Sequence, residues 1–175
     1  MMMKLSSALA VLALMFAPMS ASAQSAKPSD PQIAHIAYTA GVIDIKAAQQ
    51  ALKKSKTKSV RAFAKDMVRD HKAVNEKALA LVKKLNVTPQ DNDISKSLVK
   101  NAKEKTAELS KLKGKAFDRA YVDNEVAFHK AVNAALKDTL IPSASNAELK
   151  DLLSTGLKIF EGHQQHAEHL AASLK

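Results

Sequence analysis

Three ionisable side chains stand on the apolar faces of long helical segments, where they could do chemistry. Asp44, His71 and His163 fall in line with apolar neighbours when each segment is turned by about 100° per residue, the helical period. Imidazole nitrogens and carboxylate oxygens bind transition metals, and they also form hydrogen bonds with one another. The pattern therefore predicts an inward polar cluster that is either a metal site or a closed hydrogen-bond network.

A fourth segment carries two further candidates. Glu125 and His129 stand one helical turn apart, toward the flank of the apolar stripe, while Asn124 stands nearer its centre. Either edge of the stripe could face inward. His129, like the first two candidates above, falls near the midpoint of its segment, and the third falls about one turn beyond. Because midpoints share a layer in an antiparallel bundle, all five side chains could converge.

Burying such groups without partners costs several kcal/mol, so they should satisfy one another or bind an ion. In the metal interpretation, a zinc, iron, manganese or copper ion is held by Asp44, His71, Glu125, His129 and His163. In the network interpretation, which the sequence favours, the Asp44 carboxylate accepts a hydrogen bond from His71. The Glu-x-x-His spacing of di-iron bundles is absent and carboxylates are few, so oxidase chemistry is not expected.

No other constellation in the sequence predicts catalysis. There is no cysteine, no glycine-flanked serine, no His-Glu-x-x-His motif and no glycine-rich phosphate loop. His166 stands on the flank of its segment and His169 on the outside, so a surface metal clip with i, i+3 spacing is only a weak indication. His35 is given no role. Enzyme activity therefore has no positive support, and no catalytic residue is assigned.

Apolar residues recur with helical spacing along most of the chain, and no stretch alternates with the period of two that a strand requires. The sequence thus predicts an all-α fold. The expected helices run over residues 30–52, 59–86, 93–113, 116–140 and 146–174.

Local patterns predict where these helices begin and end. Asp91 or Asp93 can cap the third helix, Gly114 breaks it, and Pro142 stops the fourth. The stretch Ser145-Asn146-Ala147-Glu148 has the form of a capping box that opens the fifth. Short joints favour antiparallel neighbours, so the first two helices form one hairpin and the last two another. With the shorter, more polar third helix inside the connection, this is a ferritin-like antiparallel four-helix bundle.

The first 23 residues have the form of a cleavable signal peptide. Lys4 precedes an apolar run over residues 5–19, and Ala21-Ser22-Ala23 supplies the small residues of a cleavage site. The run is too short to cross about 30 Å of hydrocarbon comfortably. We therefore expect cleavage after Ala23, a flexible start over 24–29, a bundle domain over 30–175, and a periplasmic location, with outer-membrane association as an option.

The chain is basic, with a formal net charge of +10, of which the leader contributes only Lys4. In the cytoplasm such a charge would suggest nucleic acid, but export and the scattered aromatic residues argue against that partner. The lysine-rich runs are expected to be solvated, with weak contact to an anionic envelope surface. Protein partners and oligomeric state do not follow from the sequence.

Three stretches of the chain carry a family resemblance. They are Phe63-Ala64-Lys65-Asp66-Met67-Val68-Arg69-Asp70-His71, then Phe117-Asp118-Arg119-Ala120-Tyr121 with His129 two turns on, and His163 followed by Ala167 and Leu170. On these motifs, residues 30–174 resemble an exported bacterial family, the domain of unknown function DUF4142. Lys158 departs from the family, which commonly has a proline five residues before the last histidine. The resemblance implies a ferritin-like bundle, export and a loose association with envelope stress, but no established activity.

Three functional hypotheses follow. The sequence favours a non-enzymatic periplasmic bundle of the cell envelope, related to stress, with an inward Asp/His cluster. The first alternative is a metal-binding protein that uses the five candidate ligands. The second is a basic module that binds anionic envelope components.

Overall fold

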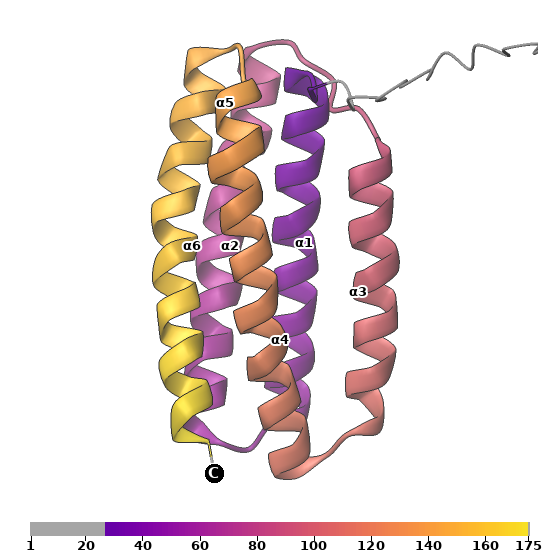
Figure 1. Ribbon diagram of the computed structural model, residues 1–175, viewed down its shortest axis with the longest axis vertical. Helices are drawn as coiled ribbons and strands as arrows, with labels where there is room; N and C mark the ends of the chain where they lie inside the picture. Colours follow the sequence, from indigo (N-terminus) through magenta and orange to yellow (C-terminus); the bar gives the residue numbers. More distant parts are fainter. Residues whose placement is uncertain (1–26, 175) are drawn as a thin grey trace, which may run out of the picture.

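The computed structural model describes residues 27–174, and every regular element among them is helical (Figure 1). The long helices are close to those predicted. The elements are α1 (Asp30–Lys54), α2 (Lys58–Lys84), α3 (Asp93–Lys111), α4 (Gly114–Ala135), the π-helical turn η1 (Leu136–Leu140), α5 (Ile141–Ser143) and α6 (Ala147–Ser173).

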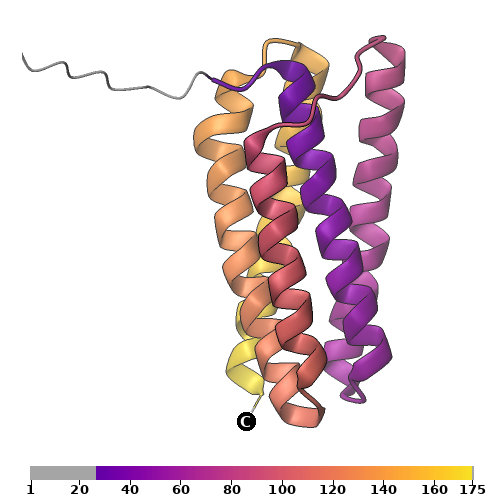
Figure 2. The same ribbon diagram turned by 90° about the vertical axis from the view of Figure 1, so that its right-hand side faces the viewer.

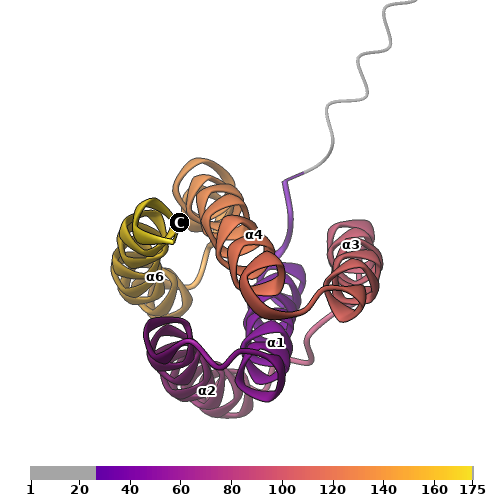
Figure 3. The same cartoon turned by 90° about the horizontal axis from the view of Figure 1, so that it is seen from below.

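Four long helices form the bundle, and the fifth lies outside it. Helix α1 packs along α2, and α4 packs along α6, so that each pair is an antiparallel hairpin. Viewed along the bundle, α1, α2, α6 and α4 stand at the four corners, while α3 lies beside α1 on the outside (Figures 2 and 3). The predicted four-helix bundle with a helix in the connection is therefore confirmed.

Two predicted helix caps are wrong, each by one residue. Asn92, and neither of the flanking aspartates Asp91 and Asp93, caps α3: its side-chain oxygen accepts from the main-chain N–H of Ser95 at 3.0 Å. All three side chains are good caps, so sequence preference could not separate them. Helix α3 therefore begins at Asp93 with a hydrogen-bonded cap, after the connection from α2.

The cap of α6 is Asn146, and not the expected capping box led by Ser145. Asn146 accepts from the N–H of Leu149 at 3.0 Å. The main-chain N–H groups of Ser145 and Asn146 donate instead to the two carboxylate oxygens of Asp30, at 2.8 and 2.9 Å. A residue distant in sequence thus sets this helix start, which a local motif could not reveal.

The prediction that the fourth helix stops before Pro142 is wrong. The helical run after α4 continues through this proline to Ser143. The π-helical turn η1 ends at Leu140, two residues before the proline. A proline within a helix lacks the N–H for an i→i−4 bond and its ring meets the carbonyl of the preceding turn. In the π turn the N–H of Ile141 donates to the carbonyl oxygen of Leu136, five residues earlier, and the helical run continues past the proline.

The interior has two apolar halves. One half is built around Phe63, Met67 and Phe117, toward the α1–α2 turn, and the other around Ile36, Leu140 and Leu153, toward α5. The predicted polar residues occupy the level between these halves. Each is thereby held by packed apolar side chains on the helical turns before and after it.

The predicted signal peptide over 1–23 lies outside the described residues, as do residues 24–26 of the expected flexible start. Among the helices that the structure describes, none is both long and apolar enough to cross a membrane.

Helices α1 and α2 approach each other closely where Gly41 faces Asn75. A Cβ atom built on Gly41 would lie 2.3 Å from the side-chain oxygen of Asn75, which is far below contact distance. Both residues are buried. The absence of a side chain at Gly41 is therefore what allows the two helices to pack at this level.

Gly41→Ala should lower the free energy of unfolding by about 1–3 kcal/mol, because the added methyl group must displace Asn75 in a packed interface. Gly162→Ala is the matched control, since its Cβ would meet nothing within 4 Å. There the usual helical preference for alanine should raise stability by about 0.5–1 kcal/mol. Urea unfolding of both variants measures this, and equal stabilisation at the two positions would contradict the close approach.

Candidate functional site

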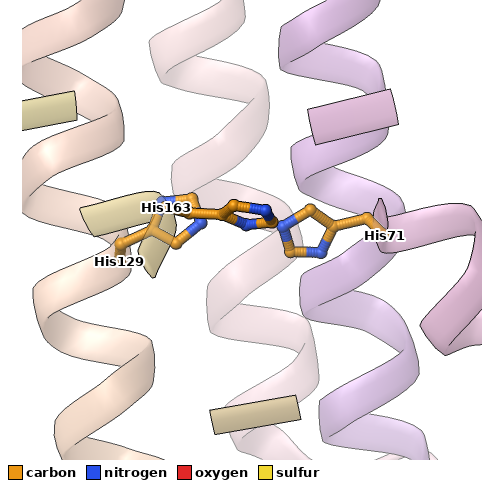
Figure 4. Close-up of side chains that lie close together, drawn as sticks. All are labelled: His71, His129 and His163. Atoms are coloured by element: carbon orange, nitrogen blue, oxygen red, sulfur yellow. The ribbon is translucent and has the colours of Figure 1, made fainter. Parts of the chain in front are cut away.

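All five predicted site residues converge on one buried level of the bundle. The exposed fractions of these residues are small, and the largest is 7% for His163. One residue comes from α1, one from α2, two from α4 and one from α6. The three imidazole rings point toward one another across the interior (Figure 4). The structure therefore brings together Asp44, His71, Glu125, His129 and His163.

Two overlapping trios have the spacing of metal ligands. In each trio, one potential ligand atom from every residue lies within 4.8 Å of the others. The first trio is His71, His129 and His163, and the second is Asp44, Glu125 and His129. His129 belongs to both, so the trios form one continuous group of donors rather than two separate sites.

Asp44 links two of the histidines. Its Oδ2 atom lies 3.2 Å from Nε2 of His71 and 3.7 Å from Nε2 of His129. Atoms that share a tetrahedral ion with bonds of 2.0–2.1 Å lie about 3.3 Å apart, so both separations are close to that value. Nε2 of His71 nevertheless makes no hydrogen bond of good geometry. The network expected between Asp44 and His71 is present as a contact but not as a hydrogen bond.

The ring of His129 is oriented by its own helix. Nδ1 lies 3.0 Å from the main-chain oxygen of Glu125, one turn earlier. Because a carbonyl oxygen can only accept, Nδ1 must donate, and the neutral ring keeps its lone pair on Nε2. That Nε2 atom is buried and has no hydrogen-bond partner. His129 therefore presents a free lone pair to the interior.

His163 is oriented from the neighbouring helix. Its Nε2 lies 3.0 Å from Oδ2 of Asp70 on α2. The carboxylate accepts, so Nε2 carries the hydrogen and Nδ1 keeps the lone pair, again buried without a hydrogen-bond partner. Arg69 in turn donates to Asp70 through Nε at 2.7 Å and Nη2 at 3.0 Å. A chain of contacts thus runs from the surface to the interior lone pair.

The role of Asp70 was not predicted from the sequence, because its partner His163 lies on a helix distant in the chain. Adjacent residues on a helix point about 100° apart. When His71 faces the bundle axis, Asp70 faces the neighbouring helix α6. The hydrogen bond from Arg69 is the main reason that the pKa of Asp70 lies below its usual value. Asp70 therefore stays ionised and remains an acceptor for His163.

Burial keeps His71 and His163 neutral. It lowers the pKa of His71 to about 4, against the attraction of Asp44, and lowers that of His163 while Asp70 opposes the shift. The unfolded chain would protonate His71 near pH 6.5, so this residue destabilises the fold as pH falls from 6.5 toward 4. At neutral pH both rings offer lone pairs.

Glu125 is fully buried, and it lies beside a second carboxylate. Burial is the main reason that its pKa is well above the usual value, and the charge of Asp44 raises it further. Burial also raises the pKa of Tyr121, one turn earlier, to which the charges of Glu125 and Asp44 add. Both side chains therefore hold their protons at neutral pH. Tyr121 is a neighbour of the site that the sequence indicated only as part of the apolar stripe.

The ambiguity in α4 resolves toward one edge of the stripe. Glu125 and His129 face the interior, whereas Asn124, which stood nearer the centre of the stripe, is only half-buried. At this edge His129 meets Asp44 of α1 and His71 of α2. Helical period alone could not select this edge.

The remaining histidines stay outside the group. His166 and His169 are both exposed. The ring of His166 packs edge-on against Phe63, with ring centroids 5.1 Å apart. His35 is half-buried near the start of α1, where Nδ1 lies 2.9 Å from the hydroxyl of Ser95. None of the three belongs to either ligand trio. The surface clip is thus not formed with His163, whose ring faces inward.

Comparison with known proteins identifies one family. A family model described as a domain of unknown function, DUF4142, matches residues 16–170. The family predicted from the sequence motifs is therefore confirmed. No curated protein and no solved structure matches the chain.

Glu125→Gln should make the metal-free protein more stable than the wild type as pH rises. Unfolded chains lose the Glu125 proton near pH 4.5, while the fold retains it to higher pH. Its contribution to stability is thus full below pH 4.5 and is lost as pH rises toward the folded pKa. The groups that face it are Asp44, His129 and Tyr121, all unchanged in the variant.

Urea unfolding of chelator-treated protein at several pH values measures this effect. The stability difference should grow above pH 4.5 by at most about 1.4 kcal/mol per pH unit. The control is Glu76→Gln at an exposed position of α2, which should give a flat difference. A flat difference for Glu125→Gln as well would contradict a retained proton.

Proposed function

The chain belongs to the DUF4142 family, a domain of unknown function, and from its interior we propose that it binds a divalent transition-metal ion. The observation that carries the proposal is the group of inward lone pairs on His71, His129 and His163 beside the carboxylates of Asp44 and Glu125. The proposed ligands are the three imidazoles and Asp44. Glu125 lies next to them, and its carboxylate would supply the second negative charge that balances a divalent ion.

Unpaired buried atoms favour a metal over a closed network. In a closed network these donors and acceptors would satisfy one another, and each one left unpaired costs about 1–3 kcal/mol. At this level of the bundle the buried imidazole nitrogens without a hydrogen-bond partner are Nδ1 and Nε2 of His71, Nε2 of His129 and Nδ1 of His163. An ion would use several of them at once.

The supporting contacts are those that a metal site needs. Metal-binding histidines usually donate their second ring N–H to a carboxylate or a main-chain oxygen, which fixes the tautomer and the ring orientation. His163 has the carboxylate of Asp70, and His129 has the carbonyl of Glu125. Both inward lone pairs are therefore set before any ion arrives.

Charge also favours a divalent ion. Burial keeps the imidazoles of His71 and His163 neutral, and Glu125 keeps its proton. A divalent ion would draw that proton off, because it stabilises the ionised carboxylate next to it. Two carboxylates and one divalent ion then leave the site neutral, which is the least costly state in an apolar interior.

The donor set matches zinc best. Zinc takes four nitrogen, oxygen or sulfur ligands in a tetrahedron, while iron, manganese and copper also accept imidazole and carboxylate. Deep burial of every donor suits a stably held ion. We further propose that the protein acts in the periplasm, in maintenance of the envelope under stress, where such a site would take up or retain the ion.

His163→Ala should abolish binding of one zinc ion per chain, because it removes an inward lone pair from the middle of the group. His169→Ala is the matched control: the same substitution on the same helix, at an exposed position. Untagged protein is freed of metal, titrated with zinc by calorimetry, and analysed for bound metal. Cobalt then serves as a spectroscopic probe of tetrahedral geometry.

The wild type and His169→Ala should bind one ion and show the same cobalt spectrum. Should the wild type bind no zinc, cobalt, iron, manganese or copper, the group is a structural network and the proposal is wrong. Equal binding by His163→Ala would also reject the assigned ligands. Circular dichroism of each metal-free variant separates a lost ligand from a lost fold.

Asp70→Asn should weaken zinc binding by about 10–100-fold without abolishing it, since Asp70 orients His163 but does not reach the ion. Asp66→Asn is the matched control, because Asp66 also pairs with Arg69, at 2.8 Å, but makes no contact with His163. Competition titration against a chelator of known affinity measures both. Equal affinities in the two variants would show that Asp70 has no positioning role.

A further inference from the structure

The half of the interior between the histidine level and α5 is incompletely filled. It holds a cavity of about 150 Å³. Its inner wall includes the buried residues Ile36, Leu153 and Phe160, and its outer end reaches the exposed Ile94 of α3 and Ala131 of α4. The cavity therefore extends from the surface beside α3 into the core.

Small side chains create this space. Helix α1 contributes Ala37 and Ala40, α2 contributes Ala78, and α6 contributes Gly156. A Cβ atom on Gly156 would stand at ordinary contact distance, 3.5 Å from Phe160 and 4.0 Å from Val74, both of which line the cavity. The volume is thus a consequence of side-chain size, and larger residues at these positions would fill it.

The lining is almost wholly apolar, with Asn75 as its one amide side chain. A buried water needs two to four polar partners, so water is a poor occupant. An enclosed apolar cavity of about 150 Å³ can stay dry and admit benzene or xenon, so this volume and lining suit a molecule of that size. We infer that this cavity is a binding site for a small, uncharged, hydrocarbon-like molecule of about the size of benzene.

The cavity adjoins the histidine level through a single ring. Phe160 lines the cavity and stacks on His71, with ring centroids 4.6 Å apart and planes within 10° of parallel. A molecule bound at the inner end of the cavity would contact the ring that stacks on His71. The binding site itself rests on the lining and the volume alone, and it stands whether or not a metal binds.

Benzene serves as the probe, and the metal-free and zinc-treated proteins are both tested. Saturating benzene should raise the unfolding temperature of the wild type, because a ligand that binds only the folded state stabilises it. Gly156→Leu places a side chain in the cavity and should abolish the shift. Gly162→Leu is the same substitution at an open position of the same helix and should retain it.

Methyl NMR of the wild type locates the probe independently of any variant. Benzene should shift the signals of Val74, Val132 and Leu153, which line the cavity, and leave those of Val60 and Leu109 in the other half of the core unchanged. No saturable rise in unfolding temperature, equal rises in the two leucine variants, or uniform methyl shifts would each overturn the inference. Should Gly156→Leu fail to fold, the methyl pattern alone decides.

Discussion

The burial of two carboxyl groups and three imidazoles on one level is the constraint around which this bundle is arranged. Such groups lose their hydration when the helices close, and they must recover that free energy from one another or from an ion. Burial lowers the pKa values of His71 and His163 and keeps Glu125 protonated. Hydrogen bonds orient the rings of His129 and His163. Several donors and acceptors still lack partners. This unfinished pairing is the observation that supports the proposed ion over a closed hydrogen-bond network.

The apolar residues on the two sides of this level fill the interior to different extents. Toward the α1–α2 turn, large side chains such as Phe63 and Phe117 fill the space between the helices on that side of the histidine rings. Toward α5, alanine and glycine positions leave a cavity that ends at Phe160. The stack of Phe160 on His71 joins the two environments. The polar level is therefore packed firmly on one side and borders an open space on the other.

The sequence was sufficient for the helices, the hairpins and the residues of the polar level, because helical period and segment midpoints both follow from spacing. It could not decide which edge of α4 faces inward, since Glu125 and Asn124 are neighbours and only packing against α1 and α2 separates them. Asp70 and Asp30 act across helices distant in sequence, so no local pattern reported their partners. A proline stops most helices. Here a π turn comes shortly before Pro142 and the helical run continues through it.

The connection through α3 has a consequence for how the protein is assembled. The α1–α2 hairpin supplies Asp44 and His71, and the α4–α6 hairpin supplies Glu125, His129 and His163. Contacts within each hairpin are closer in sequence than contacts between the hairpins, so the chain loses less entropy in forming them. Neither contains the whole donor set, so the site comes into being only when the two halves dock. An ion held there would act as a clasp between halves that the chain joins only through a long outer helix.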